Sequence, residues 1–397
     1  MNSSARLTNG SKSGVMAALL TCSMLILMGG AAVTPGLPGM QAHFFEYSDL
    51  TSFIITLPHL AVAIVGFLMG VLADRFGKVR MLVLSLLIFI ITGTGSYFLD
   101  NIYAILILRF LLGFGLAGIV CTVTALIGCY YTGQQRVRML GLQSAAMGVG
   151  VLILEVFGGA LADMSWNAPF LVYLIAVPFL ILVLLFLREP EEESVESIND
   201  NGAKNDTKTI VACYIAILVG MIVIFSIPTQ MPSYMELQLG VSATLMGLFL
   251  GFHGLGNAAF SILHRRFSSM TSSMNLIVLS FLILTIALVL PEFVAESVAV
   301  CVVTLIVSGF SVGLIVPSVS NSIVAASAPS NRGKIMGLYA VFLNIGQFAI
   351  SIVAIPVLGF VDDSYPMMFV FFALISLVMA VVMFLVYHVK RPVAKAN

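Results

Sequence analysis

GVLADRFGKVRML, residues 70–82, is a short polar stretch between two long apolar runs, Ser52–Ala73 and Val79–Phe98. Each run is about 20 residues long, the length that an α-helix needs to cross the hydrocarbon core of a bilayer. Gly70 and Gly77 permit the tight turn and the close helix approach that so short a connection requires. The sequence therefore predicts two membrane-spanning helices joined by a loop at the membrane surface. The charged side chains of that loop are Asp74, Arg75, Lys78 and Arg80.

The composition extends this prediction to the whole chain. Of its 397 residues, 60% are hydrophobic and 9% are charged, whereas soluble proteins carry about 25% charged residues. A net charge of zero argues against nucleic-acid binding. The five cysteines lie inside apolar runs at irregular spacing, so we expect neither a metal site nor a disulfide framework. The polar segment 1–14 precedes a run of spanning length, which argues against a cleavable signal peptide.

Apolar runs of spanning length recur about twelve times along the chain. We therefore expect an all-α membrane protein with twelve transmembrane helices in two six-helix halves, joined by an acidic linker. The halves share faint similarity, because RMLGL at residues 138–142 recurs as KIMGL at residues 334–338. The expected divisions are a tail at 1–14, halves at 15–187 and 209–388, a linker at 188–208 and a tail at 389–397. The expected spans are 15–35, 51–73, 79–98, 102–129, 136–161, 168–187, 208–230, 241–264, 272–290, 297–325, 333–359 and 366–388.

The charged residues indicate how these spans are oriented. Every lysine and arginine except Arg109 falls in loops or tails on one side of the predicted bundle. The loops on the other side contain acids instead, among them Glu46, Asp49 and Asp163. By the positive-inside rule the basic side is cytoplasmic. We therefore expect a multi-pass protein of the inner cell membrane with both termini in the cytoplasm.

The charged loop also carries a resemblance. Its pattern, G-x-L-A-D-R-x-G-K-x-R, resembles the loop between the second and third helices of the major facilitator superfamily of secondary transporters. In that family the acid of this loop, here Asp74, caps the N-terminus of the eleventh helix, here near Gly333, and holds the halves together when the cavity faces outward. The alternative is a topogenic turn with solvated charges. The resemblance implies a role in conformational gating for Gly70, Asp74, Arg75, Gly77, Lys78 and Arg80.

Two charges lie inside predicted spans, where an ionised group is costly and marks a functional candidate. Arg109 stands where the family has an arginine associated with proton coupling, in L-x-x-R-x-L-x-G-x-G. Residues 150–159 resemble the G-x-x-x-G-P-x-x-G-G of the family's antiporters, with Leu154-Glu155 in place of Gly-Pro. Both charges lie roughly 10 Å from the outer ends of their helices. We expect an ion pair between Arg109 and Glu155, or a carboxyl that Arg109 releases during transport; the alternatives are a purely structural arginine and an unpaired polar carboxyl.

The resemblance also implies which helices form the substrate cavity and the interface between the halves. Cavity helices 1, 7 and 10 carry no acid within their apolar runs, which favours neutral, zwitterionic or anionic substrates. The candidate cavity residues are Gln230, Ser318 and Asn321. The candidate polar residues of the interface are His59, His253 and Gln347, with the alternative that the histidines only form structural hydrogen bonds.

Together these features predict a secondary transporter similar to the drug:proton antiporter branch of the superfamily. The expected function is proton-driven export of a small molecule by alternating access. Uptake or facilitated movement of a metabolite is the alternative on the same fold, and a non-transporting membrane sensor is an alternative of another class. The chain has no phosphate-binding loop or enzyme signature, so we expect no enzymatic activity and no cofactor. The expected partners are the substrate, protons and the bilayer, and the protein is expected to be a monomer.

Overall fold

The computed structural model describes residues 9–190, 205–294 and 297–388, and this part of the chain is helical without any strand. Eleven of its helical segments are long and apolar enough to cross a membrane. The main helices of the first half are α5 (Phe53–Phe76), α6 (Lys78–Gly95), α7 (Ile102–Tyr130), α8 (Gly133–Ala162) and α9 (Ala176–Phe186), with the 3-10 segment η4 (Ala168–Ile175) before α9. Those of the second half are α10 (Thr207–Leu239), α11 (Ala243–Met270), α12 (Ser273–Phe293), α13 (Val298–Ala326), α14 (Arg332–Phe360) and α15 (Tyr365–His388).

The twelfth span is a bent pair, in which Lys12–Met24 and Met28–His43 meet at 54°. Its pieces are α1 (Asn9–Met24), α2 (Met28–Ala31), η1 (Thr34–Gly36) and α3 (Leu37–His43). The bend falls between Met24 and Met28, whereas Pro35 and Pro38 lie within the second piece, in the first turns of η1 and α3, where the missing N–H of proline is tolerated. Gly30 lets α2 approach α5, because an added Cβ would lie 2.5 Å from the Ile55 side chain. With this pair counted as one span, the predicted twelve-helix fold is confirmed.

Several expected boundaries differ from the structure; the first span, for example, continues to His43 and α11 to Met270, beyond the expected ends at 35 and 264. The helix α1 begins at Asn9, inside the segment expected to be a polar tail. The helix α10 continues to Leu239, well beyond the expected end near residue 230, although Pro228 and Pro232 lie within it. The remainder of both predicted tails and residues 191–204 of the predicted linker lie outside the described residues.

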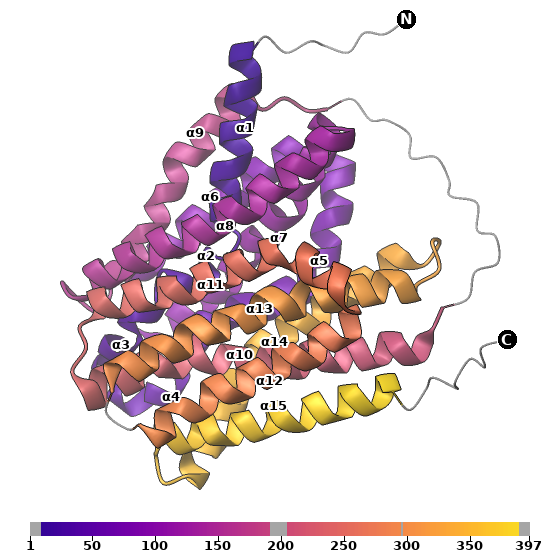
Figure 1. Ribbon diagram of the computed structural model, residues 1–397. Helices are drawn as coiled ribbons and strands as arrows, with labels where there is room; N and C mark the ends of the chain where they lie inside the picture. Colours follow the sequence, from indigo (N-terminus) through magenta and orange to yellow (C-terminus); the bar gives the residue numbers. More distant parts are fainter. Residues whose placement is uncertain (1–8, 191–204, 295–296, 389–397) are drawn as a thin grey trace, which may run out of the picture.

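Two separate apolar cores organise the molecule. Buried side chains between Val15 and Leu187 form one core cluster, and those between Ile210 and Met383 form the other. Figure 1 shows α6, α8 and α9 of the first set above α12 and α15 of the second set; α1 points upward whereas α15 runs across the view. Each group of helices therefore packs on its own core and meets the other group along limited contacts.

The contacts between the halves come chiefly from two helix pairs, α8 with α11 and α5 with α14. Along the first pair the backbones touch: an added Cβ on Gly159 would lie 2.2 Å from the Ala243 carbonyl oxygen, and one on Gly247 2.1 Å from the Glu155 carbonyl oxygen. Small residues of this kind let membrane helices pack at close range. Along the second pair, the buried hydroxyls of Thr56 and Ser351 lie 2.6 Å apart.

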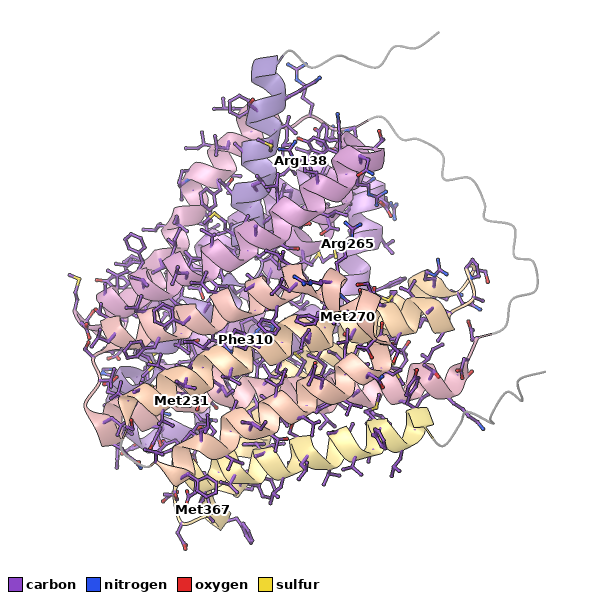
Figure 2. The ribbon with its side chains drawn as sticks, viewed as in Figure 1. Arg138, Met231, Arg265, Met270, Phe310 and Met367 are labelled. Atoms are coloured by element: carbon purple, nitrogen blue, oxygen red, sulfur yellow. The ribbon has the colours of Figure 1, made fainter. Side chains whose placement is uncertain are left out.

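Charge distinguishes the two ends of the bundle. We call one the basic end and the other the acidic end. Figure 2 shows Arg138 of α8 and Arg265 of α11 toward one side of the molecule, with Met231 of α10 and Met367 of α15 toward the other. The basic end carries Arg75, Arg80, Arg136, Arg138, Arg265, Arg266, Arg332 and Lys334. The acidic end carries Glu46, Asp49, Asp100, Asp163, Glu236, Asp362 and Asp363.

Candidate functional site

Arg109 of α7 is fully buried and forms hydrogen bonds within its own half. Its Nη1 donates to the Tyr173 hydroxyl at 2.8 Å, and its Nη2 donates to the Gly93 carbonyl and the Ser96 hydroxyl, both at 3.0 Å. The guanidinium also lies 4.7 Å from the Phe170 ring centroid and 4.9 Å from that of Tyr173. Hydrogen bonds from a charged donor are worth about 1.5–3 kcal/mol each, and a desolvated cation–π contact about 2 kcal/mol. These contacts offset much of the cost of burying the charge.

Tyr173 extends this cluster to the bent first span. Its hydroxyl accepts from Arg109 and donates to the Gly29 carbonyl at 3.1 Å. Gly93 is needed beside it, because an added Cβ would lie 2.5 Å from the tyrosine ring. The Arg109 Nε is buried without a hydrogen-bond partner among the described residues. Arg109 is therefore connected to α2, α6 and η4, and one of its donors stays free.

The expected ion pair between Arg109 and Glu155 is absent from this conformation. Within the described chain, no carboxylate lies within the 4.0 Å salt-bridge distance of Arg109, whose hydrogen bonds are to neutral groups. Glu155 is 5% exposed, and its Oε2 has no hydrogen-bond partner there either. A carboxylate this deeply buried without a partner is unfavourable in its ionised form. The two side chains therefore belong to separate surroundings.

At the acidic end, the halves are tied together by Asp163. This residue follows α8, and its carboxylate accepts from the backbone N–H of Ala243 at 3.0 Å and that of Thr244 at 3.2 Å, and from the Thr244 hydroxyl. These donors form the N-terminus of α11, where free N–H groups and the helix dipole favour an anion. Nearby, the Ser233 hydroxyl of α10 donates to the Gln41 amide oxygen of α3 at 2.8 Å. These contacts hold the two halves together at the acidic end.

The predicted gating loop at the basic end makes no such contact. Asp74 is 76% exposed and its only described ion pair is with Lys78, at 3.4 Å. The expected contact with the N-terminus of α14 near Gly333 is absent in this state. Gly70 does not mediate close helix approach, because an added Cβ would meet nothing within 4 Å. The prediction holds at Gly77, whose φ of 99° favours glycine.

The backbone N–H groups of this loop instead donate to a carboxylate of the same half. Glu189, just after α9, accepts from the backbone N–H of Val79 at 3.1 Å and from that of Lys78. It caps the N-terminus of α6 as Asp163 caps that of α11. Gly77 also makes room for it, because an added Cβ would lie 2.7 Å from the Glu189 carboxyl carbon. Arg75 lies over the Phe76 ring, 5.7 Å from its centroid, and Arg80 is exposed.

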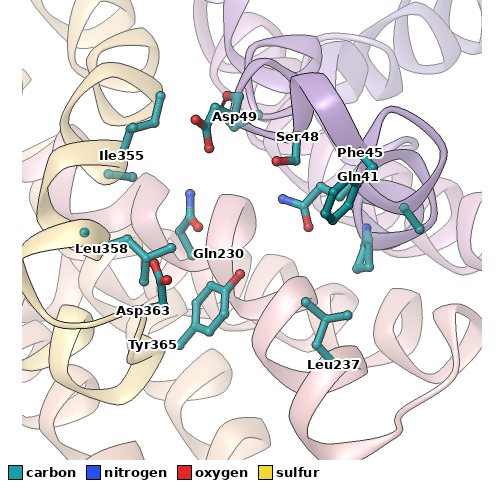
Figure 3. A pocket seen from close by; sticks show the side chains of 15 residues that line it. Gln41, Phe45, Ser48, Asp49, Gln230, Leu237, Ile355, Leu358, Asp363 and Tyr365 are labelled. Carbon is teal, nitrogen blue, oxygen red and sulfur yellow. Dashed lines mark hydrogen bonds between the residues drawn. The ribbon is translucent and has the colours of Figure 1, made fainter.

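A cavity of about 700 Å³ opens at the acidic end between the halves. Figure 3 shows side chains from α3 and α4 (Ser48–Thr51) facing side chains from α10, α14 and the start of α15. Gln230, a predicted cavity residue, lines it and is 7% exposed. The other polar side chains that line it are Gln41, Ser48, Asp49, Ser52, Asp363 and Tyr365.

The other two predicted cavity residues lie elsewhere. Ser318 is fully buried, and its hydroxyl is 3.0 Å from the Nε2 of His264. It therefore packs between α11 and α13 and does not line this cavity. Asn321 is exposed, one helical turn closer to the basic end, and is not among the cavity residues. These residues were predicted to line the cavity because of the helices on which they lie. The sequence does not show which face of each helix points toward the cavity.

The predicted polar residues of the interface also separate. His59 of α5 does face the other half, where its ring lies 5.3 Å from that of Phe225. His253 instead bonds within its half, with Nδ1 2.9 Å from the Ser308 hydroxyl. Gln347 turns toward α10 of its own half, with Nε2 3.9 Å from a methionine sulfur. Of these three residues, His59 is therefore the one with a described contact across the interface in this state.

Comparison with known proteins identifies the family. The sequence model of the Major Facilitator Superfamily matches residues 19–319 and, in a second match, residues 213–397. The chain belongs to the major facilitator superfamily. The two matches together cover both halves, and proteins of this family are membrane transporters. The protein is thus a multi-pass membrane transporter, as the loop resemblance predicted.

Relatives from this superfamily are similar over most of their length. Multidrug resistance protein 1 of Bacillus subtilis (strain 168) is 27% identical over 363 residues, which cover 88% of this chain and 91% of that protein. Tetracycline resistance protein, class B, of Escherichia coli is 21% identical over 342 residues, covering 82% and 84%. The crystal structure of a D-xylose-proton symporter matches with a TM-score of 0.77 at 15% identity, covering 94% of this chain and 97% of that one, and shares the superfamily fold.

Three residues with distinct contacts were missed by the sequence analysis of this transporter. Tyr173, Asp163 and Glu189 each bind a group far away in sequence. Asp163 and Glu189 come directly after a spanning helix, and an acid there can reach a neighbouring helix N-terminus. An acid just after a spanning helix is therefore a sequence signal for a cap on a neighbouring helix. Nothing in the sequence around Tyr173 distinguishes it from other aromatic residues in apolar runs.

Proposed function

We propose that this transporter is a proton-coupled exporter of a small molecule that works by alternating access. The observation that carries the proposal is the asymmetry of its two ends. Asp163 ties the halves together at the acidic end, whereas Asp74 makes no contact with the other half at the basic end. A transporter that alternates must hold one gate closed while the other is open. We assign the basic end to the cytoplasm by its arginines and lysines, so that this state is inward-facing.

Export is supported by the names of two relatives, which are a multidrug resistance protein and a tetracycline resistance protein. Proton coupling is supported by Glu155, a buried carboxyl without a partner. In a dry site such a group binds a proton readily and releases it when water or a cation arrives. Arg109 keeps its charge throughout and, with one donor free, is positioned to receive an anion in another state of the cycle.

The substrate class follows from the membrane part of the protein. Arg109 is the lone basic group there, so neutral, zwitterionic or anionic molecules are favoured. We further propose that the transporter is a monomer in the inner cell membrane, with both termini cytoplasmic.

The test is proton movement in proteoliposomes. Vesicles with an acidic lumen and an enclosed pH-sensitive dye receive external tetracycline, a zwitterion. Antiport exchanges luminal protons for the drug, so the lumen becomes more alkaline at a rate that depends on tetracycline concentration. We expect Glu155→Gln to abolish this coupled signal. Glu292→Gln, an exposed carboxyl at the end of α12, is the matched control and should leave it unchanged.

The outcomes separate the mechanisms. Alkalinisation that survives in Glu155→Gln would refute the coupling role of this residue. Acidification of the lumen on addition of tetracycline would mean symport. Drug movement without any proton movement would leave a facilitator.

A metabolite symporter or facilitator is the second candidate function. The observation that favours it is Leu154-Glu155, which replaces the Gly-Pro of the family's antiporters. The fold is equally compatible, because a D-xylose-proton symporter shares it. The direction of the proton signal in the same vesicles decides between the two.

A further inference from the structure

The cavity at the acidic end contains a polar group that lacks a partner. Gln230 is 93% buried, since 7% of its surface is exposed, and its amide has no hydrogen bond to any described residue. Figure 3 shows this amide directed into the cavity, between Gln41 and Ile355. The amide oxygen of the neighbouring Gln41 already accepts a hydrogen bond from Ser233. Because buried polar groups are normally hydrogen-bonded, an amide that faces this cavity is suited to hydrogen-bond to a molecule bound there.

The charges around the cavity are all of one sign. Asp49 and Asp363 are the charged side chains that line it, and no lysine or arginine is among its described lining residues. Figure 3 shows the two carboxylates on different walls: Asp49 belongs to the first half and Asp363 to the second. A ligand that reaches both would contact both halves at once.

The remaining lining is apolar and provides room for an organic molecule. A volume of about 700 Å³ lies within the range of roughly 300–1,000 Å³ typical of small-molecule sites. Leu237 of α10 and Ile355 and Leu358 of α14 line one part, and the Phe45 ring lines another. Apolar walls with a few fixed polar groups and two carboxylates match a molecule with an apolar body and a cationic nitrogen.

We propose that this cavity is a binding site for amphiphilic ammonium compounds, in which Asp49 and Asp363 receive the cationic nitrogen and Gln230 fixes the ligand by hydrogen bonding. The ammonium group belongs to a zwitterion, which agrees with the preference that Arg109 sets, or to an organic cation, which would widen the substrate class proposed above. The proposal extends the exporter function, since it rests on the cavity being the exit vestibule for a substrate that carries such a group. The exporter function concerns transport across the membrane, whereas this proposal concerns binding at equilibrium.

The experiment is binding of two probes to the full-length protein in nanodiscs, without any gradient. Ethidium represents the organic cations, because it is a fluorescent aromatic cation. Tetracycline represents the zwitterions, because it carries a dimethylammonium group. Asp49→Asn and Asp363→Asn should each weaken ethidium binding about two- to fivefold, as expected for one partly exposed charge pair. Gln230→Ala should weaken it about two- to tenfold.

The chain offers matched controls for both acids. Asp362 and Asp363 have similar backbone angles, with φ of 52° and 59°, and asparagine tolerates this left-handed region as well as aspartate does. Asp362→Asn changes the charge next to the cavity without changing its lining, so it should leave affinity within the measurement error. Glu46→Gln is the corresponding control for Asp49. Raising the salt concentration should weaken ethidium binding in the wild type more than in the double variant Asp49→Asn/Asp363→Asn.

The results separate this site from the proposed function. Equal affinity of the wild type and the double variant for both probes would overturn the site, even if proton-coupled transport were intact. Selective loss of affinity in the lining variants would support it, even if no transport were found and the exporter function had to be abandoned. Loss of affinity for ethidium alone would assign the site to cations. Loss of affinity for both probes would assign it to the ammonium group that they share.

Discussion

Breaking the Asp163 cap is expected to open the acidic end. In this state the carboxylate accepts from the N–H groups of Ala243 and Thr244 and from the Thr244 hydroxyl. Loss of such a cap costs about 0.5–2 kcal/mol, typically 1. Because the two partners belong to different halves, this free energy stabilises the closed end relative to the open one. Asp163→Ala should therefore shift the ratio of closed to open molecules roughly 2- to 30-fold toward open.

Asp163→Asn separates hydrogen bonding from charge. Asparagine caps helices about as well as aspartate, so this variant loses only the interaction of the charge with the helix dipole, about 0.3–1 kcal/mol at an exposed site. The expected shift is about two- to fivefold, smaller than for Asp163→Ala. Glu292→Ala is the control, because it removes an exposed carboxylate from the same end without touching the other half.

The assay is a distance measurement between spin labels on the two halves. Phe98 and Phe293 are 77% and 80% exposed and lie near the acidic end. Phe76 and Met270 are 53% and 75% exposed and lie at the basic end. Labelled cysteines at each pair, in a chain with Cys129 replaced by serine, should show that Asp163→Ala lengthens the first distance and shortens the second. Unchanged distance distributions at both pairs would refute the reasoning.

Three further predictions concern buried contacts. Tyr173→Phe removes the acceptor of Arg109 and a donor to Gly29, so it should destabilise the folded transporter by about 1–3 kcal/mol; thermal unfolding in detergent measures this, and a loss no greater than that of the exposed Tyr103→Phe would contradict it. Gly247→Ala should hinder closure of the acidic end, because its Cβ would lie 2.1 Å from the Glu155 carbonyl oxygen; the Phe98–Phe293 distance should lengthen, unlike in Gly359→Ala, where a Cβ meets nothing within 4 Å. Thr56→Val leaves Ser351 without its partner across the interface at a cost of about 1–3 kcal/mol; an unfolding temperature equal to that of the wild type would refute it.

The fold was predictable from the sequence because the bilayer fixes helix length. Apolar runs such as Val79–Phe98 must be about 20 residues long to span, and charged loops mark their ends. Prolines were less informative. Pro35 and Pro38 lie in the second piece of the first span, beyond its bend between Met24 and Met28, and Pro228 and Pro232 lie inside the continuous helix α10. Local sequence does not show which prolines tertiary packing will accommodate.

The site was less predictable because it depends on which face of each helix points inward. The sequence placed Arg109 and Glu155 at similar depth, but depth does not fix direction around the helix axis. Arg109 turns to Tyr173, which lies on η4, and Glu155 lies on the helix that packs against α11. The hydropathy of these helices is nearly uniform around the axis, so the pattern gives no face. Gln230 was predicted because the resemblance makes its helix a cavity helix, and it does line the cavity; the same reasoning failed for Ser318 and Asn321, which lie on other faces or at another level.

The two ends of the protein use the same capping chemistry, which suggests how alternation stays nearly balanced. At the acidic end a carboxylate after α8 caps α11 of the other half. At the basic end Asp74 is 76% exposed, and Gly333 at the start of α14 has nothing within 4 Å of an added Cβ. If α5 and α14 close there, Asp74 can cap α14 as the loop resemblance implies. Each state then gains one such cap of about 1 kcal/mol and loses the other. Neither is strongly favoured, so a substrate or a proton with a modest preference for one state can shift the population.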